Sequence, residues 1–267
     1  QVKEYLDIMD HRKTEQLIDT LDKVEQNRKE CYIREFSIEH FHDSKVFETL
    51  IPKICKIFRE ENEELTGFEN EEILAEYQIY KTPGYVYMKG NVQIYSAGKQ
   101  AADISAFPEG IAVAVGSEED VPDICPDQTI DKVFTIENLT SFYRFKQEHS
   151  LVIYLGGYHN HSRRNLLMQI YQKLPDAQYY HFGDLDAGGF YILEHLKRKT
   201  GIPFQMFQMD IETLKKYEDY AKPLTENDKK RLMQLEKMEL PDEERKLITY
   251  MLQKGIKLEQ ECISKSR

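Results

Sequence analysis

The sequence lacks tryptophan altogether and has only four cysteines among its 267 residues, Cys31, Cys55, Cys125 and Cys262. The cysteines lie far apart, so no pair has the short spacing of a zinc knuckle or of a CxxC redox pair. Four thiols are also too few for a disulfide-rich scaffold. A reducing, cytoplasmic location is therefore expected.

Long apolar runs are absent as well. No stretch approaches the roughly 18–20 apolar residues that a membrane span needs, so no membrane association is expected. The first residues, QVKEYLDIMDHRK, are charged and lack the apolar centre of an export signal. The chain begins with Gln rather than Met, which is consistent with trimming at its N-terminus.

The chain has no net excess of positive charge. It has 36 basic and 47 acidic residues, and its net charge is −11. This balance disfavours a protein whose whole surface coats nucleic acid, but it permits an enzyme that gathers carboxylates around cations. A hydrophobic content of 40% and an aromatic content of 11% suffice for a buried core and exclude bulk disorder.

The hydrophobic periodicity changes along the chain and indicates two domains. Residues 1–125 combine amphipathic helical patterns with the segment TPGYVYMKGNVQIYSAG, which is typical of a β-hairpin with Lys89-Gly90-Asn91 in its turn. A proline-containing linker follows. We therefore predict a first, α+β region over residues 1–125 and a second domain over 131–267.

Strands and helices alternate in the second domain. The expected strands are 132–136, 151–156, 177–183 and 203–209, and the expected helices are 139–148, 162–174 and 188–199. This alternation predicts an α/β fold in which crossover helices connect the strands of a parallel sheet.

Acidic residues follow two of these strands. Glu137 comes directly after the first strand, and Asp184 and Asp186 follow the third. Ligands collect at the carboxyl ends of parallel strands, so the three carboxylates should meet there if the first and third strands lie close together. Carboxylates this close need a positive counter-charge, and oxygen ligands suit Mg²⁺ or Mn²⁺. If the chain instead turns into a helix at this point, Asp186 is expected to cap it.

The residues after the second strand predict a phosphate-binding segment. The turn Gly156-Gly157 lets the backbone approach a phosphate closely, and Arg163 and Arg164 begin the next helix, where they are placed to hold one. Together with the acids, these residues suit phosphoryl transfer or phosphodiester cleavage.

Three segments carry a family resemblance. VFTIEN, LVIYLGGYHNHSRRNLL and YYHFGDLDAGG resemble, in order and spacing, the Toprim domain of type IIB topoisomerase A subunits and of their meiotic recombination relatives. The resemblance covers about residues 131–267 and implies a Mg²⁺ site at Glu137, Asp184 and Asp186. The tail KLEQECI is similar to a C-terminal motif of that family, which implies a further acid of the metal site at Glu259.

The upstream region resembles a narrower group. IREFSIEHFHDSKVFE and the Pro83-Gly84-Tyr85 segment are similar to the C-terminal region of the nuclease subunit of Wadjet anti-plasmid systems (JetD-type proteins). This resemblance implies a winged-helix-like region before the Toprim domain, a DNA contact at Lys45, and SMC-type partner subunits that extrude DNA. A homodimer is expected, because one such site commonly cuts one strand of the duplex.

One departure from the topoisomerases concerns the nucleophile. Their attacking tyrosine lies in an Arg-Glu-Ile-Tyr-Tyr-like stretch, whereas the comparable segment here is Arg34-Glu35-Phe36-Ser37-Ile38, and Tyr32 is out of register. This favours a metal-dependent DNA endonuclease in which water attacks and Glu137 helps to move protons. Two alternatives remain open: a topoisomerase-like tyrosine transesterase, and a non-catalytic DNA-binding subunit whose acids are structural.

Overall fold

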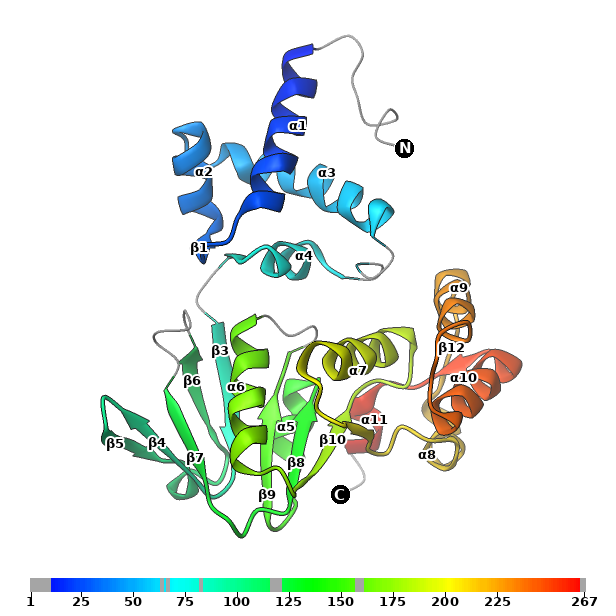
Figure 1. The fold of residues 1–267 in the computed structure, drawn as a ribbon. Helices are drawn as coiled ribbons and strands as arrows, with labels where there is room; N and C mark the ends of the chain where they lie inside the picture. The colour runs from blue at the N-terminus through cyan, green and yellow to red at the C-terminus, as the bar shows by residue number, and fades with distance from the viewer. Residues whose placement is uncertain are drawn as a thin grey trace. The chain divides into compact units, whose positions relative to one another are not determined.

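A computed structural model describes residues 11–62, 65, 68–81, 84–115, 122–156 and 161–264 (Figure 1). The chain forms two compact units, Gln1–Gly84 and Tyr85–Arg267. This division lies earlier than the boundary that we placed after residue 125 from composition. The reason is that strands between residues 84 and 126 join the sheets of the second unit.

The first unit is mainly helical. It contains α1 (His11–Gln26), α2 (Ile33–Phe41), α3 (Val46–Glu61) and α4 (Asn70–Glu76), with a short parallel pair β1 (Cys31–Tyr32) and β2 (Ile79–Tyr80). Its apolar residues recur at helical spacing, so that Phe36, Phe47 and Ile54 are fully buried between the helices. The winged-helix-like interpretation of this region stays a prediction.

The second unit is built on a six-stranded sheet. Its strands are β3 (Gly84–Lys89), β6 (Ile111–Val115), β8 (Lys132–Ile136), β9 (Ser150–Tyr154), β10 (Gln178–Phe182) and β11 (Gln205–Met206), in the order β11-β10-β8-β9-β3-β6. Strand β8 is parallel to both of its neighbours, β9 and β10, whereas β3 is antiparallel to β9. The predicted α/β fold with parallel strands is confirmed.

Helices and two smaller sheets surround this sheet. The helices are α5 (Leu139–Arg144), α6 (His161–Lys173), α7 (Ala187–Thr200), α8 (Ile211–Lys216), α9 (Glu226–Leu235), α10 (Asp242–Lys254) and α11 (Gln260–Ser264). The smaller sheets are β5-β4-β7, made of Lys99–Asp103, Val92–Ser96 and Asp123–Pro126, and the pair β12 (Lys222–Pro223) and β13 (Ile256–Lys257). Among the helices in the described ranges, none is long and apolar enough to cross a membrane.

The side chains of the parallel strands alternate between two hydrophobic cores. Val133 and Ile153 point into the core formed with α6 and α7, and Phe134 and Val152 point into the core formed with α5 and α8–α10. Because both faces of the sheet are covered, its strands are almost continuously apolar.

The predicted β-hairpin over 84–96 is wrong. Strand β3 pairs with β9 in the large sheet, whereas β4 pairs with β5 and β7 in the small one. Gly90 stands at the crossover between the sheets with φ +139°, and a Cβ there would lie only 2.5 Å from the Ser150 carbonyl oxygen. The sequence Lys-Gly-Asn thus serves a close approach of two backbones rather than a two-residue turn.

This close approach predicts a specific cost for Gly90→Ala. We expect the free energy of unfolding to fall by about 2–3 kcal/mol, because the new methyl group meets backbone that cannot move aside. The matched control is Gly98→Ala, since Gly98 also has positive φ (+74°) but nothing within 4 Å of its Cβ position. It should lose only about 1 kcal/mol. Urea unfolding monitored by circular dichroism compares the two, and equal losses would contradict the backbone contact.

Candidate functional site

The two strands that carry the predicted acids are neighbours. Strands β8 and β10 pair in parallel, with Ile136 opposite Phe182, and the Glu137 amide donates to the Phe182 carbonyl oxygen at 3.1 Å (Figure 1). The condition on which the sequence-based site depended, that the first and third strands lie together, is therefore met. Both strands end at the same edge of the sheet.

Glu137 and Asp184 meet at this edge. The Asp184 amide donates to Glu137 Oε2 at 3.3 Å, and a Cβ on Gly183 would lie 2.7 Å from the same oxygen. The glycine therefore makes room for the carboxylate. Both acids are half-buried.

Asp186 begins helix α7, as the second sequence-based interpretation expected. Its Oδ1 accepts from the Gly189 amide at 3.0 Å, and its backbone is extended (φ −147°, ψ 179°). A Cβ on Gly189 would lie 2.2 Å from the Asp184 carbonyl oxygen. The motif Asp-Leu-Asp-Ala-Gly-Gly thus needs glycine at its last position, because the first turn of the helix packs on the strand end.

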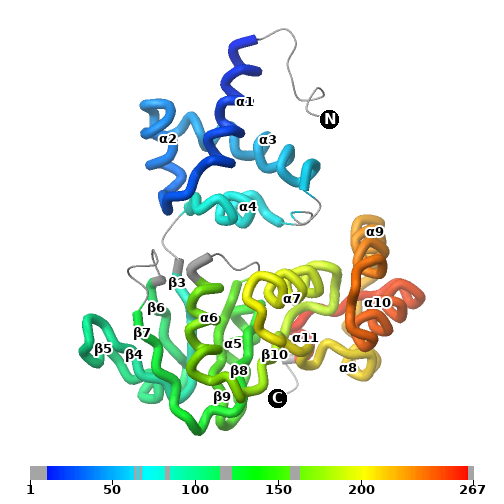
Figure 2. The backbone as a smooth tube through the Cα atoms, viewed as in Figure 1, coloured from blue at the N-terminus to red at the C-terminus, as the bar shows by residue number. Residues whose placement is uncertain are grey.

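The C-terminal helix α11 returns to this edge, near β10 (Figure 2). Its first residue is Gln260, which the sequence analysis missed. Gln260 is fully buried (0% exposed) and its amide donates to Asp184 Oδ1 at 2.7 Å. Its side chain donates to the Phe182 carbonyl oxygen at 2.7 Å and accepts from the Asn138 amide at 2.9 Å. Gln260 therefore ties the ends of β8 and β10 together and orients Asp184.

Two further acids accompany Gln260. Glu259, which the resemblance implied as an acid of the metal site, lies half-exposed and forms an ion pair with Lys222 at 2.5 Å. Glu261, not predicted, accepts from the Asn138 side-chain amide at 2.5 Å. Both are close enough to Asp184 for their charges to raise its pKa.

The site gathers excess negative charge. Burial, followed by the charges of Asp186, Glu261 and Glu259, raises the pKa of Asp184 to about 6, although the bond from Gln260 opposes the shift. This donor set of oxygens with too few counter-charges fits a hard divalent cation held by Glu137, Asp184 and Asp186. Within the described ranges, however, no three His, Cys, Asp or Glu side chains form a ready group of ligands.

The residues predicted to contact phosphate or DNA lie in different parts of the structure. Arg163 donates from Nη1 to the Leu155 carbonyl oxygen at 2.5 Å, so it braces the end of β9, and Arg164 is only 7% exposed. Lys45 is exposed at the start of α3 in the first unit. Gly157 lies outside the described residues. A role in DNA binding stays a prediction for all four.

His181 is a second residue that the sequence analysis missed. It is completely buried on β10, and its Nδ1 lies 3.0 Å from the Thr135 hydroxyl oxygen. Its Nε2 has no hydrogen-bond partner within the described part of the chain. Burial is the main reason that the pKa of His181 falls to about 3, so the ring is neutral. No local pattern in the sequence distinguishes it from an ordinary strand residue.

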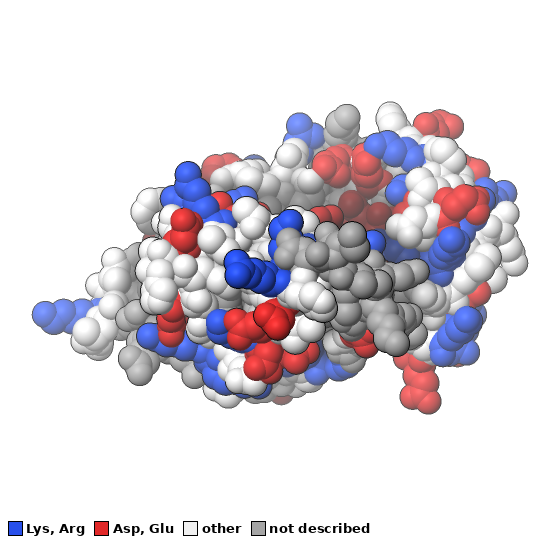
Figure 3. Space-filling view, turned by 90° about the horizontal axis from the view of Figure 1, so that it is seen from above, with Lys and Arg blue, Asp and Glu red and all other residues white. Residues whose placement is uncertain are grey.

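Surface charge gives no broad basic face in the view of Figure 3. Clusters of Asp and Glu side chains alternate there with Lys and Arg, and neither sign covers the described part of that face. This agrees with the acidic net charge of −11. Attraction to a polyanion would have to come from local groups of basic residues.

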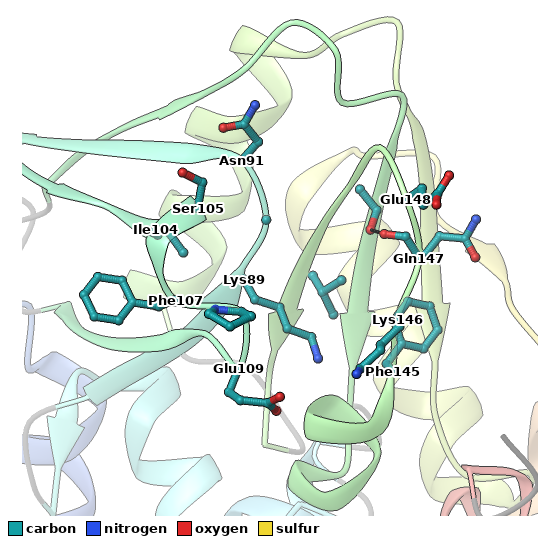
Figure 4. A pocket seen from close by; sticks show the side chains of 14 residues that line it. Lys89, Asn91, Ile104, Ser105, Phe107, Glu109, Phe145, Lys146, Gln147 and Glu148 are labelled. Carbon is teal, nitrogen blue, oxygen red and sulfur yellow. Dashed lines mark hydrogen bonds between the residues drawn. The ribbon is translucent and has the colours of Figure 1, made fainter.

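A cavity of about 700 Å³ lies elsewhere on the second unit (Figure 4). It is lined by Ser150 and the loop before β9, and therefore lies at the opposite end of the parallel strands from the acids. Lys89 reaches into its wall and donates to the Phe142 carbonyl oxygen at 2.5 Å. Burial lowers the pKa of Lys89. This contact shows that the lysine caps the end of α5. Because the cavity lies at the opposite end of the strands, we do not assign it to the acidic site.

Together, the adjacent parallel strands and the acids at their carboxyl ends define an α/β domain with an acidic site at its sheet edge. A family model described as "Wadjet protein JetD, C-terminal" matches residues 119–266, and the chain belongs to this family. Over 263 residues the chain is 28% identical to Wadjet protein JetD of Bacillus cereus (strain Q1). The matched region covers 97% of this chain and 63% of that protein. The chain thus spans less than two thirds of the length of this relative.

The raised pKa of Asp184 predicts a pH-dependent effect of Asp184→Asn. The folded chain holds this proton up to about pH 6, above the usual carboxyl range near 4, so stability should fall as the pH rises through that interval. Without added metal, Asp184→Asn should be more stable than the wild type at pH 8 by about 1–3 kcal/mol. Below pH 4 the two should unfold alike. Thermal unfolding across this pH range measures the difference, and a constant offset would contradict the assigned cause.

The buried bonds of Gln260 predict a large cost for its removal. Gln260→Ala leaves the Asn138 amide and the Phe182 carbonyl oxygen without their partner, at about 1–3 kcal/mol for each group. We expect a loss of several kcal/mol in urea unfolding. The matched control, Gln253→Ala on the exposed face of α10, should change stability by less than about 0.5 kcal/mol. A loss as small as the control's would show that Gln260 does not join the strand ends.

Proposed function

We propose that the chain is the Toprim-type catalytic part of a Wadjet defence system and that it hydrolyses DNA phosphodiester bonds with Mg²⁺ or Mn²⁺. Membership in the JetD C-terminal family supports the Wadjet assignment. The cleavage activity rests on the acidic site.

The observation that carries the proposal is the meeting of Glu137 and Asp184. They follow different strands, yet Glu137 Oε2 lies 3.3 Å from the Asp184 amide, with Asp186 two residues further along. A purely structural role explains Asp186, which caps α7, but it does not explain the crowding at Asp184, whose pKa is raised by burial and by the charges of Asp186, Glu261 and Glu259. Crowding of carboxylates around a buried acid is typical of sites that bind cations.

The residues of the site have separate roles in this proposal. Asp184 and Asp186, fixed by Gln260 and by the start of α7, hold the cation. Glu137 completes the ligand set and accepts a proton from the attacking water. The bound cation would supply charge neutralisation at the scissile phosphate and lower the pKa of water.

Partners follow from the same assignment. DNA is the substrate, SMC-type subunits of a Wadjet complex deliver it, and a homodimer supplies one site for each strand of the duplex. The net charge of −11 makes such delivery useful, because an acidic protein gains little from general attraction to DNA.

Plasmid cleavage tests the proposal with variants that keep the fold. Supercoiled plasmid is incubated with Mn²⁺ and the wild type, Glu137→Gln, Asp184→Asn or Asp186→Asn. Each variant should cut the plasmid at least about 100-fold more slowly than the wild type, because it removes a charge while preserving the shape of the side chain. Asn caps helices as well as Asp does, so Asp186→Asn separates the charge from the cap.

The matched control is Asp210→Asn. Asp210 caps α8 by accepting from the Thr213 amide, in the same way that Asp186 caps α7. The Asp210→Asn variant should therefore cut like the wild type. If Asp186→Asn and Asp210→Asn behave alike, the aspartate is only a cap and the proposal fails. The products are also run on denaturing gels, where DNA ends that carry bound protein would indicate transesterification by a tyrosine and contradict hydrolysis.

A further inference from the structure

The pairing of β8 with β10 places a buried histidine directly beneath the proposed site. Thr135 and His181 are cross-strand partners, and continuing this register by two residues sets Glu137 opposite Gly183. Successive side chains of a strand alternate between faces, so these four residues share one face of the sheet. His181 therefore occupies the position just inside the acidic edge.

The geometry at Gly183 brings His181 and Glu137 together. The position of a Cβ on Gly183 is 2.8 Å from His181 Nε2 and 2.7 Å from Glu137 Oε2. Both atoms therefore border the space that the glycine leaves open. No residue in the described ranges forms a hydrogen bond with this Nε2.

Resting on the proposed function, we propose that His181 is a positioning residue, whose Nε2–H donates a hydrogen bond to the Glu137 carboxylate when Glu137 turns to bind the cation. Carboxylates that bind metals are usually held by a hydrogen bond from outside the ligand set. His181 supplies that donor from a fully buried and rigid position on the central sheet.

The Thr135 hydroxyl permits the required tautomer. It donates its proton to the Tyr180 carbonyl oxygen at 3.2 Å and lies 3.0 Å from His181 Nδ1, so in this arrangement its oxygen would accept from an Nδ1–H. When the hydroxyl turns its proton to Nδ1 instead, the neutral ring carries its own proton on Nε2, toward Glu137. A neighbouring carboxylate favours this arrangement, since the opposite tautomer would direct a lone pair at a negative charge.

A packing role alone does not account for His181. A buried polar nitrogen without a partner destabilises the folded state, so an apolar side chain would fill the same space more favourably. The absence of a side chain at Gly183 also supports a role beyond packing, because any larger residue would separate the ring from the carboxylate.

Metal binding provides the first test. Mn²⁺ affinity is measured by titration calorimetry for the wild type, His181→Leu and His181→Gln, without DNA. His181→Leu should bind about 10-fold more weakly, and His181→Gln, which keeps an N–H donor near the same place, should recover most of the affinity. The control is His195→Leu, which removes another buried imidazole, on α7, and should bind like the wild type.

Nitrogen-15 NMR with and without Mg²⁺ provides a second test that does not require a variant at His181. We expect the Nε2 resonance of His181 to move when Mg²⁺ binds to the wild type, with the ring proton on Nε2, and not to move in Glu137→Gln. A ring proton on Nδ1 in the Mg²⁺-bound wild type, or a resonance that Mg²⁺ does not move, overturns the proposal.

The two proposals fail in different ways. If the wild type binds Mn²⁺ and His181→Leu binds it equally well, the positioning role is wrong and the proposed function stands. If the wild type binds neither Mn²⁺ nor Mg²⁺, the proposed function is wrong and the positioning role is wrong with it.

Discussion

The parallel pairing of β8 with β10 is the constraint on which the rest of the site depends. Because Ile136 lies opposite Phe182, the chain leaves both strands at the same level, and Glu137 reaches Asp184. Neighbouring strands are about 4.8 Å apart, so one intervening strand would put these residues roughly 10 Å from each other. Strand order, more than any single side chain, therefore decides whether the acids can act together.

Glycines and a returning C-terminal segment complete what the strand order begins. Gly183 leaves space for Glu137, and Gly189 lets α7 start directly against the backbone of Asp184. Gln260 then closes the edge with three hydrogen bonds to groups on both strands. The edge is thus rigid in its backbone while it concentrates negative charge, and real proteins accept such local conflict mainly at functional sites.

The sequence predicted the features that depend on local patterns and missed those that depend on distant partners. Alternating apolar segments identified β8, β9 and β10 almost to the residue, and the acids after them were placed at one edge. The hairpin failed because β3 pairs with β9, some sixty residues away, which overrides the turn preference around Gly90. Gln260 was missed for the same reason, since its partner Asn138 is 122 residues distant and a lone glutamine has no local signal.

The three acids of the proposed site are held in different ways. Asp186 is fixed at the positive end of the α7 dipole, and Asp184 accepts from the amide of Gln260. Glu137 accepts from the Asp184 amide at 3.3 Å, so the acid of one strand end contacts the backbone of the next. If the cation is bound as proposed, the three carboxylates converge from these positions, because the described residues include no ready group of three ligands although the charges already gather.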